Sequence, residues 1–195
     1  METHQPTRDE AWQLLNEFNS NPGLIKHALA VEAVMRYVAR RRGQDVEVWG
    51  AVGLIHDLDY EQFPDRHCAK TAEILRERGW PEDLVRAVVS HGYGLCTDVE
   101  PQTDMEKVLY AVDELTGLVV ATALVRPSKS VMDMAAKSVR KKWKDKAFAA
   151  GVNRQVIEDG ARRLGMELSD LITDTIMGMR EAADALGLAG NPTSP

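Results

Sequence analysis

The sequence predicts an all-α protein that folds as one domain, a bundle of helices. Apolar residues recur three and four positions apart along nearly the whole chain, which is the period of an amphipathic helix. No alternation of polar and apolar residues, the pattern of a strand, continues for a useful length. The 195 residues also contain no internal repeat, low-complexity tract or linker that would divide the chain into two domains.

Three helices are predicted before residue 58. The first lies within residues 1–20, and its apolar face should pack on the core: Trp12, Leu15 and Phe18. The turn sequence at residues 21–23, Asn-Pro-Gly, ends it. Gly43 ends the second helix, and Asp45 is expected to cap the third.

The helices after residue 58 are separated by equally clear signals. A helix should run from about His67 to Arg78, and the next should begin with Pro81, a residue favoured in the first turn. A long helix should begin near Asp104 and end before the break at residues 126–128. The remaining helices are predicted near residues 131–146, 153–164 and 168–187.

These elements group into four segments of one domain. Residues 1–20 hold the N-terminal helix, residues 21–125 the functional core, and residues 126–188 the C-terminal helices. Residues 189–195 are expected to be a disordered tail. The apolar stripes of the C-terminal helices either complete the core, which we favour, or form the surface of a homodimer.

Composition favours a cytoplasmic protein without a membrane partner. The first ten residues lack the basic and apolar regions of a signal peptide. The longest apolar stretch, residues 108–125, contains Asp113 and Glu114, so a buried helix is expected there rather than a membrane span. Cys68 and Cys96 are too few for a disulfide framework and are interpreted as ordinary thiols in a reducing compartment.

Histidines and aspartates gather where predicted helices begin or end. Burying such a group costs several kcal/mol unless it is paired or binds a metal ion. Helices of a bundle can bring these side chains to one pocket, and imidazole with carboxylate suits first-row divalent metals. The candidate ligands at helix ends are His27, His56, Asp57, His67 and His91, and a further candidate, Asp113, lies inside the helix predicted to begin near Asp104.

The order and spacing of His27, the pair His56-Asp57, and Asp113 resemble the H…HD…D signature of the HD-domain superfamily of metal-dependent phosphohydrolases. The resemblance covers roughly residues 20–125. It implies a helical bundle of the HD-domain type, in which these two histidines and two aspartates ligate one divalent metal ion.

Two further histidines lie between the HD pair and Asp113, as in the HD-GYP cyclic-dinucleotide phosphodiesterases and the similar diiron oxygenases. The resemblance therefore implies that His67 and His91 bind a second ion and that Asp57 bridges the two. Mn²⁺, Fe²⁺, Ni²⁺, Co²⁺ and Zn²⁺ all suit such ligands. Residues 91–94, His-Gly-Tyr-Gly, lack the doubled histidine and the proline of the GYP motif, which argues against cyclic-di-GMP as the substrate.

The activity implied is that of a phosphomonoesterase or phosphodiesterase acting on a nucleotide or another small phosphorylated metabolite. Metal ions lower the pKa of bound water toward about 7, so a metal-bound hydroxide is expected to attack phosphorus. Asp57 is the central catalytic residue of this hypothesis. Asp59 and Glu61 are candidates for proton transfer or for orienting a metal ligand, or they belong to a solvated acidic loop.

Residues 126–146 are basic in a chain whose net charge is −6. This segment either binds the substrate phosphate or is a solvated helix face. Its candidate substrate contacts are Arg126, Lys129, Lys137 and Lys141. The acidic net charge argues against specific nucleic-acid binding, which is typical of basic domains.

Two other functions fit the same residues. One is a diiron oxygenase of the HD fold acting on a phosphonate or a polyol, since the same six ligands occur in that class. The other is a ligand-binding signalling module without catalysis, against which the complete ligand set argues.

Overall fold

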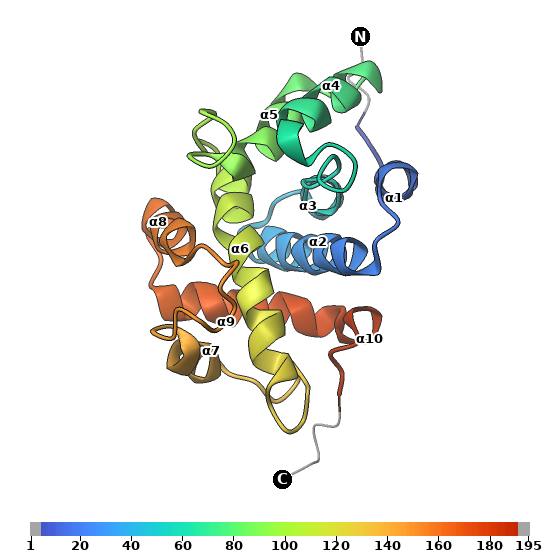
Figure 1. Ribbon diagram of the computed structural model, residues 1–195. Coiled ribbons are helices and arrows are strands. Elements are labelled where there is room, and N and C mark those ends of the chain that lie inside the picture. Colours follow the sequence, from blue (N-terminus) through green and yellow to red (C-terminus); the bar gives the residue numbers. More distant parts are fainter. Residues whose placement is uncertain (1–4, 191–195) are drawn as a thin grey trace.

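Every regular element within residues 5–190, which the computed structural model describes, is a helix, and this confirms the all-α class (Figure 1). The longer helices are α1 (Arg8–Phe18), α2 (Pro22–Arg42), α3 (Val46–Leu54), α4 (Ala69–Glu77), α5 (Glu82–Val89), α6 (Asp104–Leu124), α8 (Arg154–Leu164) and α9 (Leu168–Glu181). The shorter ones are α7 (Ala136–Lys142), α10 (Ala183–Leu186) and two 3₁₀ turns, η1 (Pro64–Arg66) and η2 (Ser90–Gly92).

The long helix α6 is the centre of the bundle. It crosses α2 and α9 and packs against α8 along one side, while α4 and α5 lie beyond one of its ends (Figure 1). Leu109, Val112 and Leu115 of this helix are fully buried. The apolar stretch at residues 108–125 is thus a core helix, and none of the described helices is long and apolar enough to cross a membrane.

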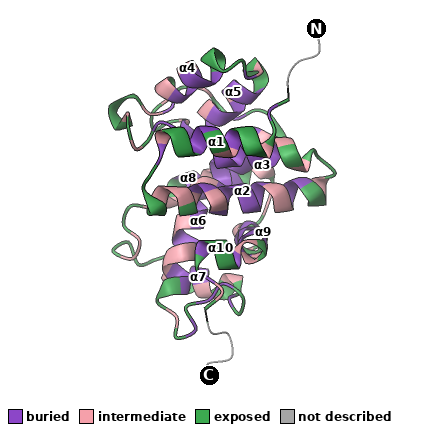
Figure 2. Ribbon diagram, turned by 90° about the vertical axis from the view of Figure 1, so that its right-hand side faces the viewer, coloured by how far each residue is buried: buried purple, intermediate pink, exposed green. Residues whose placement is uncertain are grey.

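The N-terminal helices stack in order on this centre. Helix α3 packs on α2, and α1 covers α3. Buried and exposed residues alternate along α1, so that one of its faces meets the core (Figure 2). Helix α9 packs on another side of α2, and its buried residues Ile172, Ile176 and Met179 join the same apolar cluster. The C-terminal helices therefore complete the core.

Side-chain caps fix several helix ends at positions that the sequence indicates. Thr7 forms a capping box with Glu10 at the start of α1, and Thr103 caps α6 in the same way. Asp45 accepts hydrogen bonds from two backbone amides of α3. Gly43 ends α2 at φ 64°, a left-handed conformation that glycine adopts without strain.

The helix predicted at residues 131–146 is much shorter in the structure, where α7 covers Ala136–Lys142. The preceding backbone binds other elements instead. Val131 donates its N–H to the Leu188 carbonyl (2.9 Å), and Arg180 donates to the Val131 and Met134 carbonyls. These contacts hold residues 130–135, which include a turn closed by the Met134 N–H and the Val131 carbonyl (3.3 Å), so that α7 begins only at Ala136.

The predicted disordered tail, residues 189–195, lies mostly outside the described residues, which end at Gly190. Its first residue, Ala189, accepts a hydrogen bond from Ser130 Oγ at 2.6 Å. The connection between α6 and α7 is therefore tied to the segment that follows α10.

Gly160 lets α8 approach α6 closely. A Cβ atom at this position would lie 2.5 Å from Ala111 Cβ and 2.6 Å from Ala111 Cα, and the backbone atom cannot move aside. Gly117 offers a matched comparison within α6. A Cβ added there would lie 3.4 Å from Val152 Cγ2, an ordinary contact.

We expect Gly160→Ala to destabilise the protein by about 1–3 kcal/mol, because the added methyl group forces the two helices apart. Gly117→Ala should instead leave stability unchanged or raise it by up to about 1 kcal/mol, the gain in helix propensity. Urea unfolding of both variants measures this difference. Equal stabilities would show that Gly160 is not required for the approach of α8.

Candidate metal centre

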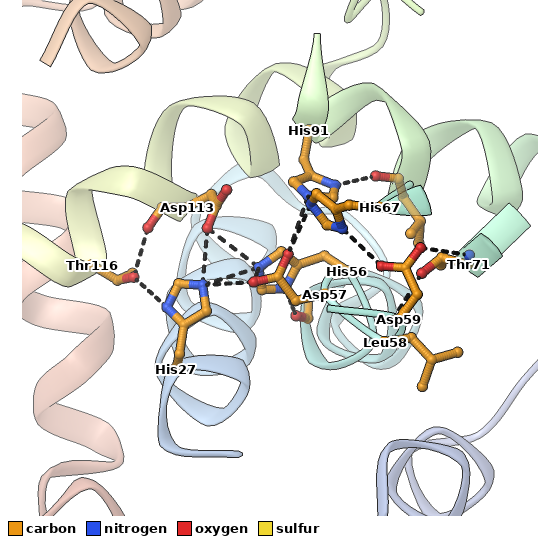
Figure 3. Close-up of polar contacts among 12 residues, drawn as sticks. His27, His56, Asp57, Leu58, Asp59, His67, Thr71, His91, Asp113 and Thr116 are labelled. Carbon is orange, nitrogen blue, oxygen red and sulfur yellow. Dashed lines mark hydrogen bonds and ion pairs between the residues drawn. The ribbon is translucent and has the colours of Figure 1, made fainter. Parts of the chain in front are cut away.

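The six predicted ligands come from distant parts of the chain and converge in one cluster (Figure 3). His27 lies near the start of α2, His56 and Asp57 lie in the turn that follows α3, and Asp113 lies in the middle of α6. His67 follows η1, and His91 is the central residue of η2. Most ligands therefore lie near helix ends, as the sequence predicts.

Four of the residues form a first group of ligand atoms. His27 Nε2 lies 3.1 Å from His56 Nε2, and Asp113 Oδ1 lies 3.0 Å and 3.3 Å from these two nitrogens. Asp57 Oδ2 is 3.5 Å from each of them. The four ligand atoms all lie within 4.8 Å of one another, which is close enough to surround one ion.

Asp57 also takes part in a second group. Its other oxygen, Oδ1, lies 3.5 Å from His67 Nε2 and 3.3 Å from His91 Nε2. Those two nitrogens are 3.2 Å apart. The carboxylate of Asp57 therefore faces one pair of histidines with each oxygen, which is the arrangement of a bridging ligand.

The outer ring nitrogens of the histidines are held by hydrogen bonds. Nδ1–H of His56 donates to the Gly53 carbonyl (2.8 Å), and Nδ1–H of His91 donates to the Val88 carbonyl (2.6 Å). His67 donates in the same way to Asp59 Oδ1 (2.7 Å). This fixes the tautomer, so each Nε2 presents a lone pair to the centre of the cluster.

His27 is oriented less directly. Its Nδ1 lies 3.3 Å from Thr116 Oγ1, and that hydroxyl donates its own hydrogen to the Asp113 carbonyl at 2.8 Å. The hydroxyl therefore accepts from His27. Thr116 follows Asp113 by three residues on α6 and so lies on the same face of the helix.

The charges of the cluster favour a cation at its centre. Burial alone would lower the pKa of His56, but the carboxylates of Asp57 and Asp113 outweigh it and raise this pKa well above its usual value. Burial would raise the pKa of Asp57, but the histidines, His56 first, hold it well below its usual range. A positive charge among these carboxylates is thus strongly stabilised.

This donor set fits divalent metal ions. Nitrogen lone pairs and carboxylate oxygens are ligands that first-row transition metals prefer, and the outer hydrogen bonds are those typical of metal-binding histidines. His27, His56, Asp113 and Asp57 would hold one ion. Asp57 with His67 and His91 would hold another.

Asp59 orients one of these ligands. Its side chain is fully buried, and it accepts hydrogen bonds from His67 Nδ1–H and from the backbone N–H of Thr71 (2.8 Å). The second bond caps α4, which starts at Ala69, two residues later than the sequence predicts. Its hydrogen bond to His67 is the contact that the role of orienting a metal ligand requires, and this role stays a prediction.

Glu61 lies in a different setting. Its carboxylate accepts hydrogen bonds from the backbone N–H groups of Ser20 (2.8 Å) and Asn21 (2.9 Å), which connect α1 to α2. These bonds, that from Asn21 first, hold the pKa of the Glu61 carboxyl below its usual value. Glu61 therefore stabilises the turn between α1 and α2, and it does not line the cavity beside the cluster.

The predicted phosphate contacts also lie away from this cavity. Arg126 forms an ion pair with Asp133 at 2.9 Å. Lys137 and Lys141 line a shallow depression of their own on α7. None of these residues, nor Lys129, lines the cavity beside the ligands within the described part of the chain.

The cavity beside the cluster has a volume of about 370 Å³ and is bordered by His27, Asp57, His67 and Asp113. Three of its other lining residues were not predicted as site residues: Tyr60, Leu95 and Val152. Tyr60 places its ring edge-on to His67, with ring centres 5.2 Å apart. Tyr60 follows the HD pair closely in the sequence. This proximity is the one sequence signal that could have indicated Tyr60 as a site residue.

Glu114 lines the same cavity and is also new as a site residue. It accepts the backbone N–H of Asn153 at 3.0 Å. Burial raises the pKa of this carboxyl above its usual value. Its position directly after Asp113 could have indicated a place at the site, but helical periodicity alone puts adjacent residues on different faces.

Asp57→Ala should remove metal binding at both positions, because one carboxylate serves both groups of ligands. His67→Ala should lose about one metal equivalent and keep the other. Plasma mass spectrometry of the purified variants measures the metal content, with Asp83→Ala, an exposed carboxylate on α5, as the control. Full metal content in Asp57→Ala would rule out the bridge.

Asp59→Asn should weaken the binding of one metal equivalent by about 10–100-fold, the usual effect of removing a group that orients a ligand. The amide can still occupy the space, but it no longer favours the tautomer of His67 that presents Nε2. Titration with a chelator measures both affinities. A parallel loss at both positions, or at neither, would contradict this role.

Comparison with known proteins identifies the core. The family model of the HD domain matches residues 24–118, the segment that contains all six ligands. Two curated relatives, both named Ribonuclease Y, come from Nitratidesulfovibrio vulgaris strains DP4 and Hildenborough; each is 26% identical over 109 residues. This covers 54% of the chain and 20% of each relative. No solved structure matches significantly. Residues 24–118 therefore contain an HD domain, the domain of the superfamily that the sequence resembles.

Proposed function

We propose that this protein is a metal-dependent phosphoric-ester hydrolase that acts on a small phosphorylated metabolite. The observation that carries the proposal is the carboxylate of Asp57, which faces a histidine pair with each oxygen beside an open cavity. Divalent metal ions held there would supply an activated water and neutralise charge on the phosphoryl oxygens.

The residues of the chain have separate tasks in this proposal. His27, His56, His67 and His91 hold their Nε2 atoms toward the centre through fixed outer hydrogen bonds, so little reorganisation is needed when metal and substrate bind. Tyr60 and Glu114 line the cavity and are the polar groups that can contact the leaving group.

A second hollow supports a substrate with an apolar organic group. It has a volume of about 350 Å³ and shares His27 and Gly117 with the metal cavity. The rest of its lining is almost wholly apolar, with Val120, Leu124 and Leu188 among its residues. A phosphate at the ligand cluster would place its organic group along this hollow, whose one lysine is Lys26.

The scarcity of basic residues supports a substrate of low charge. Among the described residues, Lys26 is the only lysine or arginine that lines either hollow, and Lys137, Arg140 and Lys141 of α7 line another depression. The curated relatives are named as ribonucleases, but the match spans only a fifth of their length. We therefore propose a phosphate monoester or a small diester rather than RNA.

We expect metal-dependent release of phosphate from aryl phosphates and nucleoside monophosphates, with slower reaction of nucleoside triphosphates and of an oligoribonucleotide. Apoprotein reconstituted with Mn²⁺, Fe²⁺, Ni²⁺, Co²⁺ or Zn²⁺ is assayed across this panel, with and without a chelator. Asp57→Asn should be inactive, and Asp83→Asn should keep full activity.

The same assay is repeated without oxygen to separate hydrolysis from the oxygenase alternative. Unchanged turnover in anaerobic buffer is the result expected of a hydrolase. Substrate-dependent oxygen uptake by the Fe²⁺ form, together with no phosphate release from any substrate, would replace this proposal with the oxygenase.

A further inference from the structure

Cys68 and Cys96 lie side by side although 28 positions separate them in the sequence. Their Sγ atoms are 2.6 Å apart, and neither cysteine forms a disulfide bond. Gly92 gives them this room. A Cβ atom at Gly92 would lie 2.5 Å from Cys68 Sγ and closer still to Cys96 Sγ, so any side chain there would displace the sulfur atoms.

Both cysteines are next to proposed metal ligands. Cys68 directly follows His67, and its backbone takes φ 67°, a conformation that non-glycine residues rarely adopt. Cys96 lies in the tight loop after His91, where three successive backbone N–H groups, those of Leu95, Cys96 and Thr97, donate to the Gly92 carbonyl. The sulfur pair therefore joins the two segments that carry the second pair of histidines.

The pair is also accessible from solvent on one side. Cys68 is buried, whereas Cys96 is exposed. Both border a cavity of about 390 Å³ that Arg76 and Arg86 also line. A small disulfide compound can approach Cys96 through this cavity, where Arg76 and Arg86 form ion pairs with Glu82 and Glu106.

We propose that Cys68 and Cys96 are a redox-active pair that forms a reversible disulfide and thereby clamps the segments bearing His67 and His91. A disulfide bond measures about 2.05 Å, so the sulfur atoms need to close by only about half an ångström. In a cytoplasmic protein such a bond is typically transient and responds to redox conditions.

The oxidant is a low-molecular-weight disulfide. The thiolate of Cys96 attacks one sulfur of this compound and releases the other half as a thiolate. The thiolate of Cys68 then attacks Cys96 Sγ in the mixed disulfide and releases the second half. The two protein thiols are oxidised, the oxidant is reduced to two thiols, and those thiols take up the two protons.

The clamp should affect the second metal position, a consequence that rests on the proposed metal centre. His67 Nε2 and His91 Nε2 lie 3.2 Å apart, and a covalent bond between their neighbours limits how far these nitrogens can separate. The oxidised protein should therefore hold its second metal equivalent longer than the reduced protein does.

The test uses the full chain treated with glutathione disulfide and analysed by mass spectrometry after thiol alkylation. The wild-type protein should lose two hydrogens and both alkylation sites. Cys68→Ser should keep glutathione on Cys96, because the second thiol is missing. Cys96→Ser should remain unmodified, because Cys68 is buried. If Cys68→Ser does not fold, Cys68→Ala serves in its place.

Two further measurements follow the consequences of the bond. The disulfide should raise Tm by about 10 °C, and the oxidised protein should release its second metal to a chelator about 10-fold more slowly. Failure of the proposed hydrolase activity would leave the disulfide and the Tm shift unaffected, so the two proposals fail independently.

Two results would overturn the disulfide. One is a stable glutathione adduct on Cys96 of the wild-type protein with Cys68 still free. The other is a metal equivalent that protects both thiols from alkylation and is lost in the Cys68→Ser/Cys96→Ser double variant, which would make the cysteines metal ligands.

Discussion

The two oxygens of the Asp57 carboxylate hold the functional centre of this protein together. Oδ2 faces the Nε2 atoms of His27 and His56, and Oδ1 faces those of His67 and His91 at similar distances. Nitrogen lone pairs and carboxylates gathered this closely are stable only when positive charge lies between them, because their mutual repulsion is weakly screened in a buried site. The fold must therefore hold the elements that carry these histidines and carboxylates in fixed relative positions.

The helices meet that requirement by crossing near the ligands. The crossing of α2 and α6 brings His27 to Asp113, and the packing of α3 on α2 places the HD turn between them. On the other side, η2 packs against α6 and carries His91. Each ligand thus lies on or beside an element whose position is set by the apolar core, and the core can keep the geometry of the site constant.

The sequence was sufficient to predict the helical class and the histidines and aspartates that cluster, and the reason is physical. Helical periodicity can be read from the sequence because the polarity of each residue indicates whether its side chain is buried. Buried histidines and aspartates need partners, so His56 and Asp57 indicate a cation even before the partners are known. The positions of His27 and Asp113 followed from the resemblance to a known family rather than from periodicity.

What the sequence could not predict depends on contacts between distant segments. Lys137 and Lys141 share a helix face, but only the packing of α7 shows that they line a different depression from the cavity beside the ligands. In the sequence, Asp59 cannot be distinguished from other acidic residues, because its contact with the first turn of α4 depends on the fold. The meeting of Cys68 and Cys96 depends on the bare backbone of Gly92, which no spacing rule reveals.

The contacts of Asp59 have a consequence for local unfolding of the protein. Asp59 and Thr71 exchange two hydrogen bonds, while the Asp59 carboxylate also accepts a hydrogen bond from His67 Nδ1–H. Fraying of the first turn of α4 and disorder of His67 are thus one thermodynamic event. By linkage, an ion that bound His67 would also stabilise that turn, and a change that stabilised the turn would raise the affinity for the ion.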